Sequence, residues 1–301
     1  MAGPSDSAQP VDAQLLASLA TMELRARALV EGYYSGHHRS HYRGASVEFA
    51  DHRPYSHGDE LRHLDWRLYG RSDRFFVKQY EAETNLTVHL LVDASGSMGY
   101  PERGVSKLAC ASYLAAGLAY LAWRQRDAVG LSVFDTAVRQ QLPPQTRRGH
   151  LQELFAALEG TQPGGETGIG PVLGEIGAGL HRRGLLILLS DLLDEPAQVV
   201  RGLGLLRSRG HDVIVLQVLD RGELDLGLRG PVIAEDLESG ERLVTDAEEV
   251  RSRYAQAVQR HLQVLREGCA ARGIDHELMV TDRPLGPALV AYLARRRRRV
   301  R

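Results

Sequence analysis

The 301-residue sequence is poor in cysteine, lysine, aromatic residues and long apolar runs. Its two cysteines, Cys110 and Cys269, are too few for a disulfide framework or a cysteine-based zinc site. The longest purely aliphatic run covers residues 185–189, whereas a bilayer-spanning helix needs about 20 apolar residues. Residues 1–11 are small and polar and do not resemble a secretion signal. These absences predict a soluble cytoplasmic protein.

The chain also lacks an excess of charge of either sign. Its 37 basic and 38 acidic residues give a formal net charge of −1, which argues against a general polyanion binder. No ribbon of basic and aromatic residues and no finger spacing suggests nucleic-acid recognition, so no nucleic-acid partner is expected. Only Lys78 and Lys107 are lysines, a bias that genomic base composition explains. The terminal arginines of residues 295–301 are interpreted as a solvated tail, with weak contact to an anionic surface as the alternative.

What the sequence does contain is 43% apolar residues, enough for a sizeable core, arranged as alternating strands and helices from residue 85 onward. This alternation predicts a doubly wound, Rossmann-like α/β fold with a mostly parallel sheet covered on both faces. A β-hairpin insertion is expected around Ser239–Gly240. In such sheets, ligands bind beyond the carboxyl ends of the strands. The predicted strands cover residues 86–92, 128–134, 185–189, 213–218 and 275–280.

The N-terminal part has a different character. Asp12 is a candidate helix cap, and an apolar stripe at helical spacing runs from Leu15 to Leu29 before Gly32 and Gly36. Residues 37–82 are dense in Arg, His, Asp and Tyr, which predicts an irregular arm packed on a neighbouring domain. We therefore divide the chain into an N-terminal helix and arm (1–82), an α/β domain (83–283), and a C-terminal helix with its basic tail (284–301).

One group of oxygen-bearing side chains stands at predicted strand ends. Asp93, Ser95 and Ser97 occupy alternate positions directly after the first strand of the sheet, and Gly96 allows a tight turn between them. Thr167 follows the Gly164–Gly165 turn, and Asp191 ends another strand. Carboxylate and hydroxyl oxygens suit Mg²⁺ or Mn²⁺. The bland alternative is a capped turn in which these side chains bond only backbone N–H groups.

These five residues resemble the metal-ion-dependent adhesion site of von Willebrand factor type A domains in order, spacing and position over about residues 85–282. The resemblance implies a von Willebrand factor A-like fold in which the serines and the threonine bind the ion, and the aspartates bind it directly or through water. It also implies one open coordination position for an acidic side chain of a protein partner. Two aspartates balance a divalent ion, and the neutral hydroxyls leave it attractive to a further carboxylate.

The N-terminal arm resembles the signature of the Domain-of-Unknown-Function-58 family. The segments that carry this resemblance are RGASVEF (43–49), RPY (53–55), GDELR (58–62), LDW (64–66), RSDR (71–74) and VKQYE (77–81). Membership implies association with MoxR-type AAA+ ATPases and a metal-dependent role as adaptor or co-chaperone-like protein. This chain departs from the family pattern by one inserted residue, Glu166, directly before Thr167. Glu166 either points to water, which we favour, or plugs the open position.

The competing hypotheses concern the same ion. The sequence contains no P-loop, no complete dinucleotide fingerprint and no nucleophile elbow, so we expect a binding module with no catalytic residues rather than an enzyme. A metal-dependent hydrolase stays the alternative, since a bound ion can activate water. The sequence offers no obvious general base beside the ion, and a choice of His211 or His276 would be a guess. A structural protein with an empty site is the third hypothesis.

Overall fold

The computed structural model describes residues 11–37, 52–54, 69–70, 75–78, 86–101, 104–180, 182–227, 229–235, 237–238 and 240–300. The chain forms two compact units. One comprises the residues up to 39 together with residues 85–299, and the other comprises residues 40–84. In the latter, β1 (His52–Pro54) pairs antiparallel with β2 (Phe76–Lys78), so the segment expected to be irregular contains a short ladder. Most of the arm signature, such as residues 43–49 and 58–66, lies outside the described residues.

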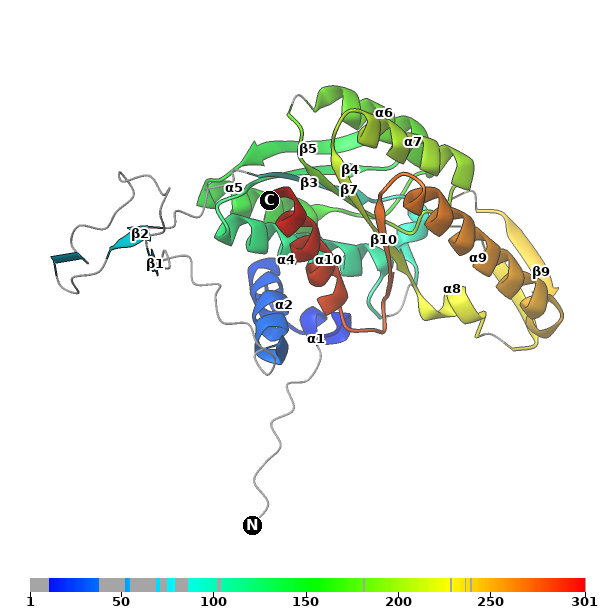
Figure 1. The fold of residues 1–301 in the computed structure, drawn as a ribbon. Helices are drawn as coiled ribbons and strands as arrows, with labels where there is room; N and C mark the ends of the chain where they lie inside the picture. The colour runs from blue at the N-terminus through cyan, green and yellow to red at the C-terminus, as the bar shows by residue number, and fades with distance from the viewer. Residues whose placement is uncertain are drawn as a thin grey trace, which may run out of the picture. The chain divides into compact units, whose positions relative to one another are not determined.

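The larger unit is built on a six-stranded sheet in the order β10-β7-β6-β3-β4-β5 (Figure 1). Every neighbouring pair is parallel except β4 and β5, which are antiparallel. The predicted mostly parallel sheet is therefore confirmed. Its strands are β3 (Thr87–Asp93), β4 (Ala128–Phe134), β5 (Val138–Gln145), β6 (Leu185–Ser190), β7 (Asp212–Leu219) and β10 (Asp275–Val280).

Helices cover both faces of this sheet, as a doubly wound fold requires (Figure 1). On one face, apolar residues of α1, α2, α4, α5 and α10 form a buried cluster with Val88 and Leu90 of β3. On the other face, α6, α7 and the end of α9 bury a second cluster around Leu91. Neighbouring residues of β3 enter opposite cores because side chains alternate along a strand. The helices are α1 (Ala13–Ala17), α2 (Met22–His37), α4 (Lys107–Arg124), α5 (Arg148–Gly160), α6 (Ile169–Gly179), α7 (Pro196–Ser208), α8 (Arg221–Asp225), α9 (Ala247–Ala270) and α10 (Gly286–Val300).

The N-terminal helical segment differs from the single stripe expected. Asp12 does cap α1, since its Oδ1 accepts a hydrogen bond from Leu15 N at 2.8 Å. The helix ends at Ala17, however, and a second helix begins at Met22, which leaves Leu15 47% exposed. Gly32 does not end α2 either. A Cβ at that position would lie 2.3 Å from Val11 Cγ2, so this glycine lets Val11 pack closely against α2.

The C-terminal basic run also differs from the expected tail. Residues up to Val300 continue α10, and Arg295 is only 9% exposed. Its guanidinium donates to Gly273 O at 2.6 Å and lies 3.2 Å from Asp275 Oδ2. The interpretation as a solvated tail is therefore wrong for Arg295, because the apolar face of α10 carries this residue against the loop before β10. Within the described ranges, no helix has both the length and the apolar character needed to span a bilayer.

The predicted hairpin is present. Strands β8 (Pro231–Glu235) and β9 (Arg242–Asp246) pair antiparallel and lead directly into α9. Asp246 caps that helix by accepting a hydrogen bond from Glu248 N at 2.8 Å. The strands are poorly buried, and apolar side chains such as Ile233 and Val244 are 68% and 74% exposed. The hairpin is thus held by its ends and its tip rather than by the core.

A buried histidine in β3 predicts a pH-dependent stability. His89 is 2% exposed, its Nε2 lies 3.0 Å from Ser132 Oγ, and burial together with the charge of His211 lowers its pKa to about 4. In the unfolded chain His89 becomes protonated near pH 6.5, whereas in the native chain it stays neutral until about pH 4. Acidification therefore favours unfolding. We expect His89 to remove about 2 kcal/mol of stability between pH 7 and pH 5. Urea titrations at both pH values should show a smaller loss for His89→Gln, and an equal loss would contradict the assignment.

Candidate metal centre

Three loops meet at the carboxyl edge of the sheet, where the sequence predicts the ligands. The loop after β3 contacts the loop before α6 through two backbone hydrogen bonds, from Gly96 N to Gly165 O (2.9 Å) and from Gly164 N to Ala94 O (3.0 Å). The end of β6 contacts the end of β3 through Ser190 Oγ, which donates to Asp93 Oδ2 at 2.5 Å. Residues 69 to 97 positions apart in sequence are thereby brought together.

The loop after β3 places the first three predicted ligands together. Asp93 and Ser95 are fully buried, and Asp93 Oδ1 accepts a hydrogen bond from Ser95 N at 2.9 Å. A short 3-10 turn, Gly96–Gly99, follows and brings Ser97 Oγ to 3.2 Å from Ser95 Oγ. One carboxylate and two hydroxyl groups therefore lie side by side. The contact between Asp93 and Ser95 is also the one that a capped turn would make, so it does not by itself distinguish the two hypotheses.

The Gly164–Gly165 turn is fixed from the side by β5. Gly165 has a φ of +76°, a conformation that favours glycine, and a Cβ there would lie 2.8 Å from Asp135 Oδ2. Arg139 donates through its guanidinium to Gln162 O at 3.0 Å and to Gly164 O, while its Nε donates to Asp135 at 2.6 Å. This arrangement holds the turn that presents Thr167.

Asp191 makes a contact that the sequence did not suggest. Its Oδ2 accepts a hydrogen bond from Lys107 Nζ at 2.7 Å, and the same Nζ lies 2.5 Å from Glu223 Oε1 on α8. The side chain of Lys107 is fully buried. Burial opposes its charge, but the carboxylates of Asp191 and Glu223 outweigh burial and raise the lysine pKa above its usual value. The only available signal in the sequence was a rare lysine at the start of an apolar helix.

The site nevertheless keeps an excess of negative charge. Burial and the nearby charge of Asp191 raise the pKa of the Asp93 carboxyl to about 7. The three carboxylates of Asp93, Asp191 and Glu223 carry three formal negative charges, and Lys107 supplies one positive charge. Two negative charges remain when Asp93 is ionised, and one remains when it is protonated; a divalent cation would favour the ionised form.

Thr167 lies at the same loop cluster but contacts a side chain that the sequence analysis missed. Its backbone N donates to Glu238 Oε2 at 2.9 Å, and its hydroxyl donates to Glu238 Oε1 at 2.5 Å. Glu238 comes from the turn between β8 and β9. Glu166, considered as a plug from sequence, is exposed to solvent instead. The structure thus brings Asp93, Ser95 and Ser97 into direct contact, whereas Thr167 and Asp191 reach the cluster with partners of their own.

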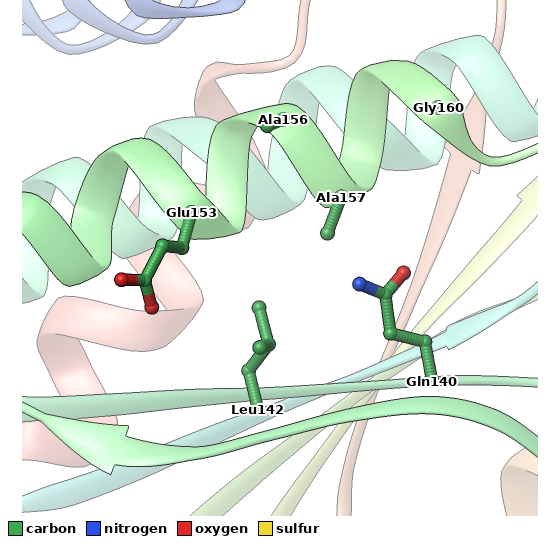
Figure 2. A pocket seen from close by; sticks show the side chains of 6 residues that line it. All are labelled: Gln140, Leu142, Glu153, Ala156, Ala157 and Gly160. Carbon is green, nitrogen blue, oxygen red and sulfur yellow. The ribbon is translucent and has the colours of Figure 1, made fainter.

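A hollow elsewhere on the unit does not belong to this site. It has a volume of about 470 Å³ and lies between β5 and α5 (Figure 2). Gln140 and Glu153 point toward it from opposite elements, with Leu142 between them. Small side chains of α5 complete its wall, and none of the five predicted ligands lines it.

The topology of this unit is that of a von Willebrand factor A-like α/β domain. Over residues 51–264 the chain matches the family described as "Protein of unknown function DUF58", and it belongs to that family. It is 28% identical over 298 residues to Uncharacterized protein Rv1480 of Mycobacterium tuberculosis and to Uncharacterized protein Mb1516 of Mycobacterium bovis. Each alignment covers 95% of this chain and 91% of the relative.

Two solved structures align with the chain, and the first resembles it in fold. BatB from Bacteroides thetaiotaomicron, a conserved hypothetical protein, aligns with a TM-score of 0.50 and 20% identity, over 70% of this chain and 98% of that chain. The SpRpn10 VWA domain aligns with a TM-score of 0.40 and 11% identity, over 68% of this chain and 94% of that chain.

Proposed function

We propose that this protein is a binding module that captures an acidic side chain of a protein partner through one divalent cation, Mg²⁺ or Mn²⁺. Asp93, Ser95, Ser97, Thr167 and Asp191 would hold that cation. The observation that carries the proposal is the meeting of three loops, each bringing oxygen-bearing side chains, at the carboxyl edge of the sheet. This edge is where open α/β sheets bind ligands.

The chemistry of the donor set fits such an ion. Oxygen atoms alone are the donors that Mg²⁺ and Mn²⁺ prefer. A carboxylate has about four acceptor positions, and the hydrogen bonds found on Asp93 come from Ser95 N and Ser190 Oγ. Those on Asp191 come from Lys107 and Leu193 N. Lone pairs therefore remain on both aspartates, and the hydroxyl groups keep acceptor capacity as well.

The same charges favour an acidic partner. When bound, the cation supplies a centre of positive charge that is compensated by Asp93 and Asp191 but not by the neutral hydroxyl groups. A partner carboxylate would complete its coordination. Membership of the family supports a MoxR-type AAA+ ATPase as that partner, because the signature of the arm resembles proteins associated with such ATPases.

The hydrolase alternative receives less support from the positions of the histidines. His211 precedes β7 and accepts a hydrogen bond from Gly184 N at 3.3 Å, at the opposite, amino edge of the sheet. His276 is hydrogen-bonded to Gln217 at 2.9 Å, and burial with the charge of Arg266 lowers its pKa to about 4. Such an imidazole is a weak base near neutral pH, so we favour binding over hydrolysis.

A pull-down tests the proposal. The immobilised chain should retain the MoxR-type ATPase of the same organism in Mg²⁺ and release it in EDTA, because the ion bridges the two proteins. Asp93→Ala should lose retention while its circular dichroism stays that of the folded chain. Glu166→Ala, which removes an exposed carboxylate, is the control and should retain the partner. Retention that survives both EDTA and Asp93→Ala would refute the proposal.

A further inference from the structure

We infer that Glu238, at the tip of the β8–β9 hairpin, is the chain's own stand-in for the partner carboxylate. It closes the cation site in the resting protein, and the hairpin has to move before an acidic partner binds. This inference rests on the proposed function and adds to it an internal competitor and a moving element.

The contacts of the hairpin tip place Glu238 at the site. Both of its carboxylate oxygens accept hydrogen bonds from Thr167, one from the backbone N and one from the hydroxyl. The tip also lies directly on Gly96, between the two predicted serine ligands. A Cβ at Gly96 would be 2.8 Å from Leu237 O and 3.3 Å from Glu238 Cγ. The absence of a side chain at Gly96 is thus what lets the tip approach.

The position of the Glu238 carboxylate is unfavourable for a negative charge unless a cation is present. Asp93 and Asp191 already bring two carboxylates to the same loops, and like charges at short distance repel. The carboxylate of Glu238 nevertheless bonds Thr167 of the same loop cluster. It does so although it belongs to an exposed hairpin, from which a side chain could extend into water. A divalent cation held by Asp93 and Asp191 would attract the carboxylate of Glu238 through their shared neighbour, the loop of Thr167. The internal carboxylate therefore has the charge and the location that the proposed function assigns to the partner.

The hairpin is also built to release. Its strands are exposed along most of their length and contribute no residue to either buried cluster. A tethered carboxylate competes with external carboxylates at an effective concentration on the order of millimolar. A partner therefore displaces Glu238 only if further contacts add to its own carboxylate. The device would exclude isolated acidic metabolites and admit a protein surface.

The experiment uses Mn²⁺ bound to the full chain and acetate as a minimal carboxylate probe. Bound Mn²⁺ relaxes the methyl protons of acetate strongly only when acetate reaches the ion. With acetate at about 0.1 mM, well below the effective concentration of the tethered carboxylate, we expect little relaxation by the wild-type chain and a rise of at least about threefold in Glu238→Gln. Glu166→Gln is the matched control, since it removes the same charge one residue from Thr167, and it should behave as the wild type.

The outcomes separate the two proposals. If the wild-type chain binds Mn²⁺ and acetate relaxation is equal in all three chains, the assignment of Glu238 is wrong and the metal site stands. An equal rise in Glu166→Gln also overturns the assignment, because it would reflect charge alone. If the wild-type chain binds no Mn²⁺, the proposed function fails and the role of Glu238 fails with it. Circular dichroism of each variant verifies that the chain is folded.

Discussion

Replacing Lys107 with methionine is expected to lower the free energy of unfolding of the metal-free chain by about 3–5 kcal/mol. The ammonium group is fully buried and lies 2.7 Å from Asp191 and 2.5 Å from Glu223. Methionine has a similar length but leaves the buried carboxylate of Asp191 and the partly buried carboxylate of Glu223 without a positive charge. Urea unfolding monitored by circular dichroism measures the loss. Arg148→Met is the control, because it removes an exposed positive charge and should change stability by no more than about 0.5 kcal/mol.

The coupling of this ion pair can be measured directly. In a chain that carries both Lys107→Met and Asp191→Asn, the second change removes one of the stranded carboxylates, so the double variant should be more stable than Lys107→Met alone. Mn²⁺ should also raise the melting temperature of Lys107→Met by more than that of the wild type, because the ion replaces the missing charge. If Lys107→Met were as stable as the wild type, the stabilising role of the ion pair would be contradicted.

Replacing Asp93 with asparagine is expected to weaken Mn²⁺ binding by at least about 100-fold, since changes outside the ligand set already cost 10–100-fold. The same change should raise the melting temperature of the metal-free chain at pH 8. The fold raises the pKa of this carboxyl to about 7, so its ionised form is disfavoured by folding, and the neutral amide avoids that cost. Electron paramagnetic resonance of unbound Mn²⁺ and a thermal melt measure the two effects.

A matched control distinguishes this result from a general loss of negative charge. Asp225→Asn removes a carboxylate that is 61% exposed and 3.6 Å from Arg221. It should leave both Mn²⁺ affinity and the melting temperature close to those of the wild type. Unaltered Mn²⁺ affinity in Asp93→Asn would remove Asp93 from the ligand set.

The sheet and the location of the site were predictable because both follow from local pattern. Strands buried on both faces are continuous apolar runs, such as Leu185–Ser190, and the carboxyl ends of parallel strands share one edge. Asp93 and Asp191 therefore had to approach each other. The hairpin around residue 240 was predictable for a similar reason, since turn residues separate two short strand-like segments.

The side chains that contact the predicted ligands were not predictable, because these contacts depend on how elements distant in sequence are placed in the fold. Lys107 meets Asp191 only because the cap at Ser106 starts α4 beside the end of β6. Glu238 contacts Thr167 only because the hairpin bends over Gly96, and the sequence does not indicate the direction of that bend. Neither distance follows from spacing along the chain. The break between α1 and α2 escaped prediction for a different reason, since the helical spacing of apolar residues continues through it.

The most direct test of the central claim is the titration of the metal-free wild-type chain with Mn²⁺, followed by electron paramagnetic resonance. The account predicts one bound Mn²⁺ per chain, displaced by excess Mg²⁺, because the five proposed oxygen donors come from three loops that meet at the carboxyl edge of the sheet. A chain that retains no Mn²⁺ while folded, or that binds it equally well without Asp93, would contradict the account.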